Sequence, residues 1–155
     1  MSNFKTETFE FSEIPSTLDE LKSLPEAKLE TPFMTAALTV LALCRYEKDV
    51  NSAIEMINFL KGPVDLTEYD KQFLRDRLKG KSYVPRSYFE GTSPENDYTP
   101  PVPLTIKVFE YAYSYSEDGY AMLEIRSSGA DSPRQIKLRK KGSEWFLWQQ
   151  YLLPD

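Results

Sequence analysis

The sequence predicts an α+β fold, in which an N-terminal bundle of three or four helices packs on a C-terminal four-stranded antiparallel meander. Capped segments with apolar residues at helical spacing fill positions 15–80, and alternating apolar positions separated by turns fill 104–153. Between them, positions 81–103 form a connection rich in proline and aromatic residues. A chain of 155 residues suits one domain. Within one domain, we expect the helices to pack on one face of the sheet.

Residues 1–14 form a polar arm ahead of the first helix. The arm contains four large apolar residues, Phe4, Phe9, Phe11 and Ile14. The arm either adds an edge strand, docks on the core or remains a partly ordered tail.

The first expected helix is short. Ser16 is its expected N-cap, with Asp19 three residues later in the capping-box position, and Pro25 ends it.

The second helix is expected to be the central one. Thr31 and Pro32 supply an N-cap followed by proline at the first helical position, and the helix should end near Tyr46. Its apolar residues surround the helix instead of forming one stripe, which is typical of a buried helix.

Two further helices follow, each with a start and a stop signal. Asp49 caps the third, and Gly62 with Pro63 stops it. Thr67 caps the fourth, with Asp70 at the third helical position, and Gly80 ends it.

The four expected strands alternate in their apolar positions. The first begins at Leu104, and its pattern changes parity near Phe109, which predicts a bulge or bend that leaves Tyr111, Tyr113 and Tyr115 on one strand face. Strands around 121–125, 136–138 and 145–153 follow, separated by turns at 117–119, 127–133 and 141–143.

The composition lacks the residues that several common catalytic and metal-binding sites require. The chain has no histidine, and its only cysteine, Cys44, lies in the apolar run of the central helix. We therefore expect no catalytic residue, metal site or cofactor. The net charge of −5 argues against nucleic acid as a partner. The sequence shows neither a signal peptide nor a membrane span, so a cytoplasmic location is expected.

Six motifs occur in an order that resembles a known family. They are TPFMTAALTVLALCRY, NFLKGP, QFLRDRLKGK, YVPRSYF, RSSGADSPR and WFLW. Together they cover roughly residues 14–153 and resemble a family of bacterial proteins classed only as a domain of unknown function. The resemblance implies no activity, and the N-terminal arm lies outside it.

The hairpin that joins the second and third expected strands is the best candidate ligand site. Two arginines flank a turn with hydroxyl groups and backbone N–H groups, a combination that suits a carboxylate or a phosphate. The same residue types are also common in turns without any ligand. In that case, one of the arginines only stabilises the hairpin through an internal contact. The candidates are Arg126, Ser127, Ser128, Asp131, Ser132 and Arg134, together with Arg86 from the connection.

Tyrosines form the candidate partner surface. Tyrosine presents a flat ring with a polar tip and is enriched at interfaces, although it also fills the space between a sheet and a loop. The candidates are Tyr98, Tyr111, Tyr113 and Tyr115.

Three functions agree with these features. The leading expectation is a non-enzymatic intracellular protein-interaction or regulatory module that binds an unidentified protein partner. One alternative is a small-molecule-binding domain or weak enzyme for an anionic ligand, which uses Arg126, Arg134 and Arg86. The other is an immunity-type protein, by analogy with small acidic domains of that class.

Overall fold

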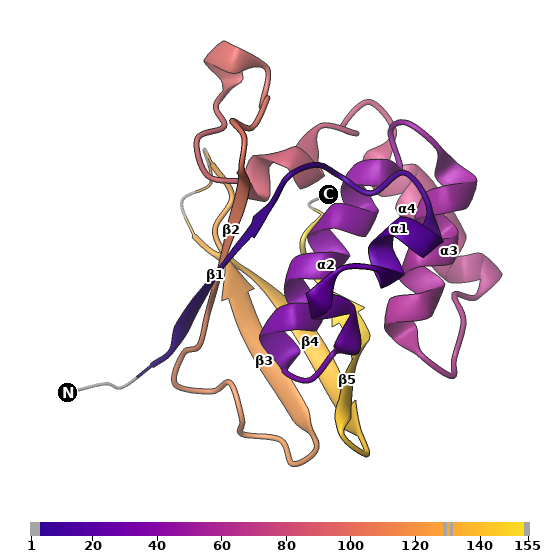
Figure 1. Cartoon of the computed structure of the whole chain (residues 1–155), viewed down its shortest axis with the longest axis vertical. Helices are drawn as coiled ribbons and strands as arrows, with labels where there is room; N and C mark the ends of the chain where they lie inside the picture. The colour runs from indigo at the N-terminus through magenta and orange to yellow at the C-terminus, as the bar shows by residue number, and fades with distance from the viewer. Residues whose placement is uncertain (1–3, 129, 131, 154–155) are drawn as a thin grey trace.

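Five antiparallel strands form a single sheet in the order β1-β2-β3-β4-β5 (Figure 1). The computed structural model describes residues 4–128, 130 and 132–153. The strands are β1 (Thr6–Phe11), β2 (Leu104–Phe109), β3 (Tyr120–Ile125), β4 (Arg134–Lys141) and β5 (Glu144–Gln150). The α+β class and the antiparallel order of the last four strands are confirmed, but the expected number of strands is wrong by one.

The additional strand is β1, which comes from the N-terminal arm. It pairs with β2, with Phe9 opposite Ile106 and Phe11 opposite Leu104. Phe9 and Phe11 are buried while Glu10 between them is exposed, so β1 is a half-buried strand. Of the alternatives for the arm, the edge strand is the one observed.

Four α-helices lie between β1 and β2, and α2 covers most of the sheet, while α3 contacts β5. The helices are α1 (Leu18–Lys22), α2 (Pro32–Arg45), α3 (Val50–Lys61) and α4 (Glu68–Leu78), with short 3-10 helices η1 (Pro25–Lys28), η2 (Val84–Tyr88) and η3 (Pro94–Asn96). From Pro32 to Cys44 every residue of α2 except Met34 is buried, and α2 contacts β2, β3, β4 and β5. Because α2 packs directly on the sheet and α3 packs on α2 (Figure 1), the expected helical bundle is not confirmed.

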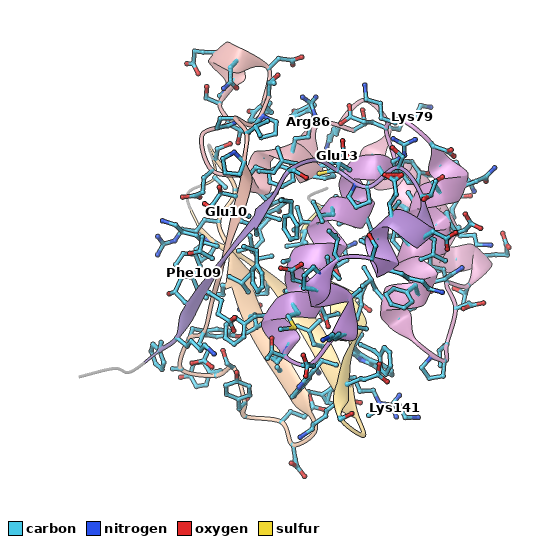
Figure 2. The ribbon with its side chains drawn as sticks, in the orientation of Figure 1. Glu10, Glu13, Lys79, Arg86, Phe109 and Lys141 are labelled. Carbon is cyan, nitrogen blue, oxygen red and sulfur yellow. The ribbon has the colours of Figure 1, made fainter. Side chains whose placement is uncertain are left out.

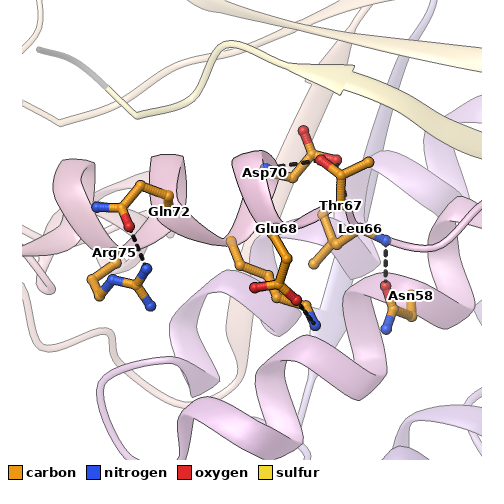
Figure 3. Close-up of polar contacts among 8 residues, drawn as sticks. Asn58, Leu66, Thr67, Glu68, Asp70, Gln72 and Arg75 are labelled. Atoms are coloured by element: carbon orange, nitrogen blue, oxygen red, sulfur yellow. Dashed lines mark hydrogen bonds and ion pairs between the residues drawn. The ribbon is translucent and has the colours of Figure 1, made fainter.

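The caps of the three longer helices are confirmed. The side chains of Thr31 and Asp49 accept hydrogen bonds from the backbone N–H groups three residues later, at 3.2 Å each. Thr67 and Asp70 form a complete capping box at the start of α4 (Figure 3). The cap expected at Ser16 is wrong, because Thr17 accepts from the Glu20 N–H instead. Either neighbour can cap a helix.

The segment after β2 does not continue as a strand. β2 ends at Phe109, and residues 112–119 form turns and bends. The Ser114 hydroxyl accepts from the Tyr111 N–H at 2.9 Å, and Ser114 O accepts from Met122 N at 2.8 Å. The expectation that Tyr111, Tyr113 and Tyr115 share a strand face is therefore wrong. The irregular register lies between Lys137 and Leu138 of β4 and not near Phe109.

No helix in the described ranges has the length and apolar character needed to cross a bilayer.

Candidate functional site

The two arginines of the expected hairpin site lie in different surroundings. The Arg134 guanidinium donates to the Tyr88 hydroxyl at 3.1 Å and to Leu152 O at 3.4 Å, on the helix-covered side of β4. Arg126 is exposed and stacks its guanidinium over the Phe109 ring, 4.5 Å from the ring centroid. The two side chains therefore do not converge on one anion.

Arg134 lines a polar pocket of about 270 Å³ between the hairpin and the 81–103 connection. Its lining residues come from the end of the helical half, from η2 and the loop beyond it, and from the hairpin. They are Lys81, Tyr83, Val84, Ser87, Tyr98, Ser127, Ser128, Ala130 and Arg134. None of these described lining residues is a carboxylate.

Hydroxyl groups join the hairpin to the connection at the base of the pocket. Ser87 Oγ lies 2.7 Å from Ser127 Oγ, and Thr92 Oγ1 lies 2.9 Å from Ser128 Oγ. Ser128 N also donates to Ser87 O at 2.8 Å. These bonds fix the hairpin against η2, so the pocket is part of the packed structure.

The direction of the hydroxyl bonds follows from proton counting. A serine or threonine hydroxyl has one hydrogen, and Ser87 and Thr92 donate theirs to the carbonyls of Val84 and Phe89. In the two hydroxyl–hydroxyl contacts, the donors are therefore Ser127 and Ser128. These two serines offer lone pairs to the pocket, while Arg134 offers N–H groups.

Tyr88 holds Arg134 in place from beneath the pocket. Its hydroxyl accepts from Arg134 and donates to Leu152 O, and its ring is buried. Burial raises the pKa of Tyr88 to about 12, although the hydrogen bond from Arg134 acts in the opposite direction. Tyr88 is therefore neutral near pH 7. The partners that the structure shows for Arg134 are neutral oxygens, so they leave its charge uncompensated.

Two tyrosines form the aromatic wall of the pocket. The rings of Tyr83 and Tyr98 stack with centroids 5.0 Å apart and an interplanar angle of 20°. Arg86 supports this wall from outside the pocket: it donates to Asp97 O at 2.7 Å and to Tyr98 O at 3.3 Å. Its Nε also lies 2.9 Å from a carboxylate oxygen of Glu47. Arg86 (Figure 2) therefore orders the loop and does not line the pocket.

Of the remaining hairpin candidates, Ser132 is exposed and is not among the lining residues of the pocket. Asp131 lies outside the described residues. The described part of the chain contains no group of three or more carboxylates and cysteines placed to hold a metal ion. Burial raises the pKa of the Cys44 thiol well above its usual range, so Cys44 is no thiolate nucleophile near neutral pH.

The four candidate tyrosines do not form one surface. Tyr98 belongs to the pocket wall, whereas Tyr113 and Tyr115 are 69% and 52% exposed on the turns after β2. The Tyr115 hydroxyl donates to Glu110 at 2.7 Å, and Tyr111 accepts from Gln135 at 3.1 Å. Burial raises the pKa of both Tyr111 and Tyr115.

The prediction from the sequence missed Lys81, Tyr83, Ser87 and Thr92 as site residues. Lys81 is explained equally well as a cation after a helix, and serines in a loop carry no distinct signal. One signal did point here: a long aromatic connection between two halves usually packs down. This signal indicates that the connection packs against the domain, but it does not indicate that the connection packs on the hairpin.

Comparison with known proteins gives a family but no activity. No curated protein and no solved structure matches the chain. A family model described as Domain of unknown function (DUF6935) matches residues 13–155, which include every described lining residue of the pocket but not β1. The chain therefore belongs to the family of this domain of unknown function.

Proposed function

We propose that this protein is a non-enzymatic binding module for a small hydroxylated anion, of the class of sugar phosphates or sugar acids. The observation that carries this proposal is the pocket in which Arg134 lies beside Ser127 and Ser128. This function is the alternative expected from the sequence, but of the three arginines expected to bind the anion only Arg134 lines the pocket.

The chemistry of the lining matches each part of such a ligand. Arg134 presents a planar guanidinium for a phosphate or carboxylate, and Lys81 adds a second positive charge to the wall. Ser127 and Ser128 have their protons engaged inside the protein, so they accept hydrogen bonds from ligand hydroxyl groups. The stacked rings of Tyr83 and Tyr98 offer an apolar surface for the C–H face of a sugar.

Binding without turnover agrees with the same geometry. Ser127 and Ser128 donate to other hydroxyls, and among the described lining residues none is a carboxylate or histidine able to take their protons. A bound ligand would bridge the hairpin and the connection, which is how a regulatory module responds to a metabolite.

The test compares glucose 6-phosphate, glucose and inorganic phosphate as ligands in thermal-shift and calorimetric titrations. We expect the phosphorylated sugar to bind most tightly, because only it engages the cations and the serines together. Arg134→Lys keeps the charge but loses the planar fork, and should weaken binding of the phosphorylated sugar about tenfold. Ser127→Ala should weaken it less and should not affect phosphate binding.

Arg126→Lys is the matched control. It is the same change on the same hairpin, at a side chain that stacks on Phe109 outside the pocket. We expect the affinity of this control to equal that of the unmodified chain. If both arginine variants lower affinity equally, or if none of the three ligands binds, the pocket is not the site proposed.

Recognition of a protein partner, the leading expectation from the sequence, is a second candidate function. It is supported by large aromatic side chains exposed away from the pocket, among them Tyr69 at 78% and Tyr113 at 69%.

A further inference from the structure

A groove runs along β5 on the side facing α4, apart from the polar pocket. It consists of two adjoining hollows of about 160 and 240 Å³. Lys61, Asp70, Leu147, Trp148 and Gln149 line both hollows, so the two are continuous.

The groove exists because only the second half of α4 packs closely. Leu74 and Leu78 are the buried residues of this helix, whereas Tyr69 in its first turn is 78% exposed. The start of the helix is nevertheless firmly held. Leu66 N donates to Asn58 at 2.8 Å, and the capping box fixes the first turn (Figure 3). The opening is therefore a built feature of the fold.

The first hollow is mainly apolar. Its apolar lining residues come from α2, α3, the loop after α3, α4 and β5, and include Leu43, Ile57, Leu66, Phe73, Leu74 and Leu147. Tyr69, which is 78% exposed, stands at its rim. The Trp148 ring, 41% exposed, packs edge-to-face on Tyr120 with centroids 5.7 Å apart and carries the Arg139 guanidinium 5.1 Å from its centroid. An exposed aromatic ring beside a hydrophobic hollow is typical of an interface that takes an anchoring side chain.

Positive charge gathers in the second hollow. Lys61, Arg139 and Lys141 line it, and Lys141 lies at the tip of the β4–β5 hairpin (Figure 2). Asp70 is the one carboxylate among the described lining residues of either hollow, and it accepts from Thr67 N at 2.9 Å within the capping box. The groove is therefore net positive on a protein whose net charge is −5.

From this juxtaposition we infer that the groove binds an acidic segment of another protein, with a large apolar side chain in the first hollow and carboxylates beside Lys61, Arg139 and Lys141. The exposed Tyr69 ring favours a peptide over a free fatty acid, because a peptide continues past the hollow and covers this ring. The inference does not depend on the ligand of the polar pocket.

A labelled peptide tests the inference by fluorescence anisotropy. The probe is an eight-residue peptide with adjacent leucine and phenylalanine residues flanked by glutamates, compared with the same peptide in which lysines replace the glutamates. We expect only the acidic peptide to bind, with affinity that falls as salt is added. Tyr69→Ala should weaken binding about tenfold without lowering the melting temperature, because the ring is mostly exposed.

Two matched controls separate the groove from the rest of the surface. Tyr113→Ala removes a ring that is 69% exposed on the turns after β2, and should leave the affinity unchanged. Arg139→Gln and Lys141→Gln should each weaken binding about two- to fivefold, whereas Lys107→Gln, the same loss of charge on β2, should not.

Three outcomes would overturn the inference. One is equal binding of the acidic and basic peptides, and another is equal loss on Tyr69→Ala and Tyr113→Ala. The third is displacement of the acidic peptide by decanoate at submillimolar concentration, which would assign the groove to a single acyl chain instead of a protein segment.

Discussion

At the scale of single residues, Asp49 shows how a cap makes stability depend on pH. Its carboxylate accepts from the backbone N–H and the hydroxyl of Ser52 at 3.2 and 3.0 Å. The backbone bond is the main cause that lowers the pKa of Asp49 below its usual value of 3.8. A lowered pKa in the folded state means that the stability contribution is present above pH 3.8 and is lost as the pH falls through the folded-state pKa.

We therefore expect Asp49→Asn, which keeps a capping side chain without a titrating group, to reduce the acid dependence of unfolding. The chain and the variant should differ in stability at neutral pH, and this difference should shrink below pH 3.8. Urea unfolding across the acid range measures it. A difference that stays constant with pH would show that Asp49 titrates alike in both states.

Tyr88 makes the opposite kind of contribution, in alkali. Its pKa is raised to about 12 from the usual 10.0, so the stability linked to its neutral form is present below pH 10 and is lost between pH 10 and 12. Tyr88→Phe leaves Leu152 O and one Arg134 N–H without this partner, which should cost about 1–3 kcal/mol at neutral pH.

The cost of Tyr88→Phe should diminish as the pH rises above 10, which denaturant unfolding at several alkaline pH values measures. Tyr113→Phe is the control, because Tyr113 is 69% exposed, and it should change stability by less than about 0.5 kcal/mol. Equal effects of the two variants would contradict a buried hydrogen-bonding role for Tyr88.

At the scale of elements, Gly62 decides how α3 ends. Its φ is +78°, and a Cβ there would lie 2.6 Å from Cδ1 of Phe146 on β5. Gly142, in the β4–β5 turn, has a φ of +64° but no atom within 4 Å of the corresponding position. Both glycines have a positive φ, but Gly62 has a ψ of −127°, which lies outside the left-handed helical region. Gly62 also brings the end of α3 against β5.

We expect Gly142→Ala to cost about 1–2 kcal/mol from backbone strain alone. Gly62→Ala should cost about 2–5 kcal/mol, because the clash with Phe146 adds to backbone strain at a φ of +78° and a ψ of −127°. Comparing the two free energies of unfolding measures the joint cost of this backbone conformation and of the contact between α3 and β5. Equal costs would mean that Phe146 moves aside freely.

Elements whose signals are local were predicted correctly. Thr31, Asp49 and Thr67 start helices through bonds to residues three positions away, which is within the reach of sequence reasoning. The misplaced cap at Ser16 and the misassigned tyrosine segment arose where two local structures share one pattern. Alternating tyrosines suit a strand face, but the Ser114 hydroxyl stabilises a turn instead.

At the scale of the whole molecule, the candidate site was predicted only in part. Arg134, Ser127 and Ser128 were expected in a ligand site and line the pocket, while Arg126 and Arg86 do not. The difference arises from a long-range contact: Ser87 meets Ser127 across 40 residues of sequence. Local periodicity places residues on faces of strands, but it does not say which loop will cover them.

The N-terminal arm lies outside the family match, because β1 ends before residue 13. Its contacts show whether it belongs to the domain. Its Phe9 and Phe11 are 7% and 5% exposed and pack into the common core, opposite Ile106 and Leu104 of β2. The part of the chain outside the family match therefore completes the sheet and closes the core at its β2 edge.

We expect Phe9→Ala and Phe11→Ala each to lower the free energy of unfolding by about 3–5 kcal/mol, the usual cost of removing a buried phenylalanine. Thr8→Ala, at the exposed position directly before Phe9, should change it by less than about 0.5 kcal/mol. Denaturant unfolding of the three variants decides the matter. If all three variants leave stability unchanged, the arm is a tail that the core does not need. If only the phenylalanine variants are destabilised, β1 is part of the domain, and a protein that begins at residue 13 would leave the hydrogen-bonding edge of β2 unpaired.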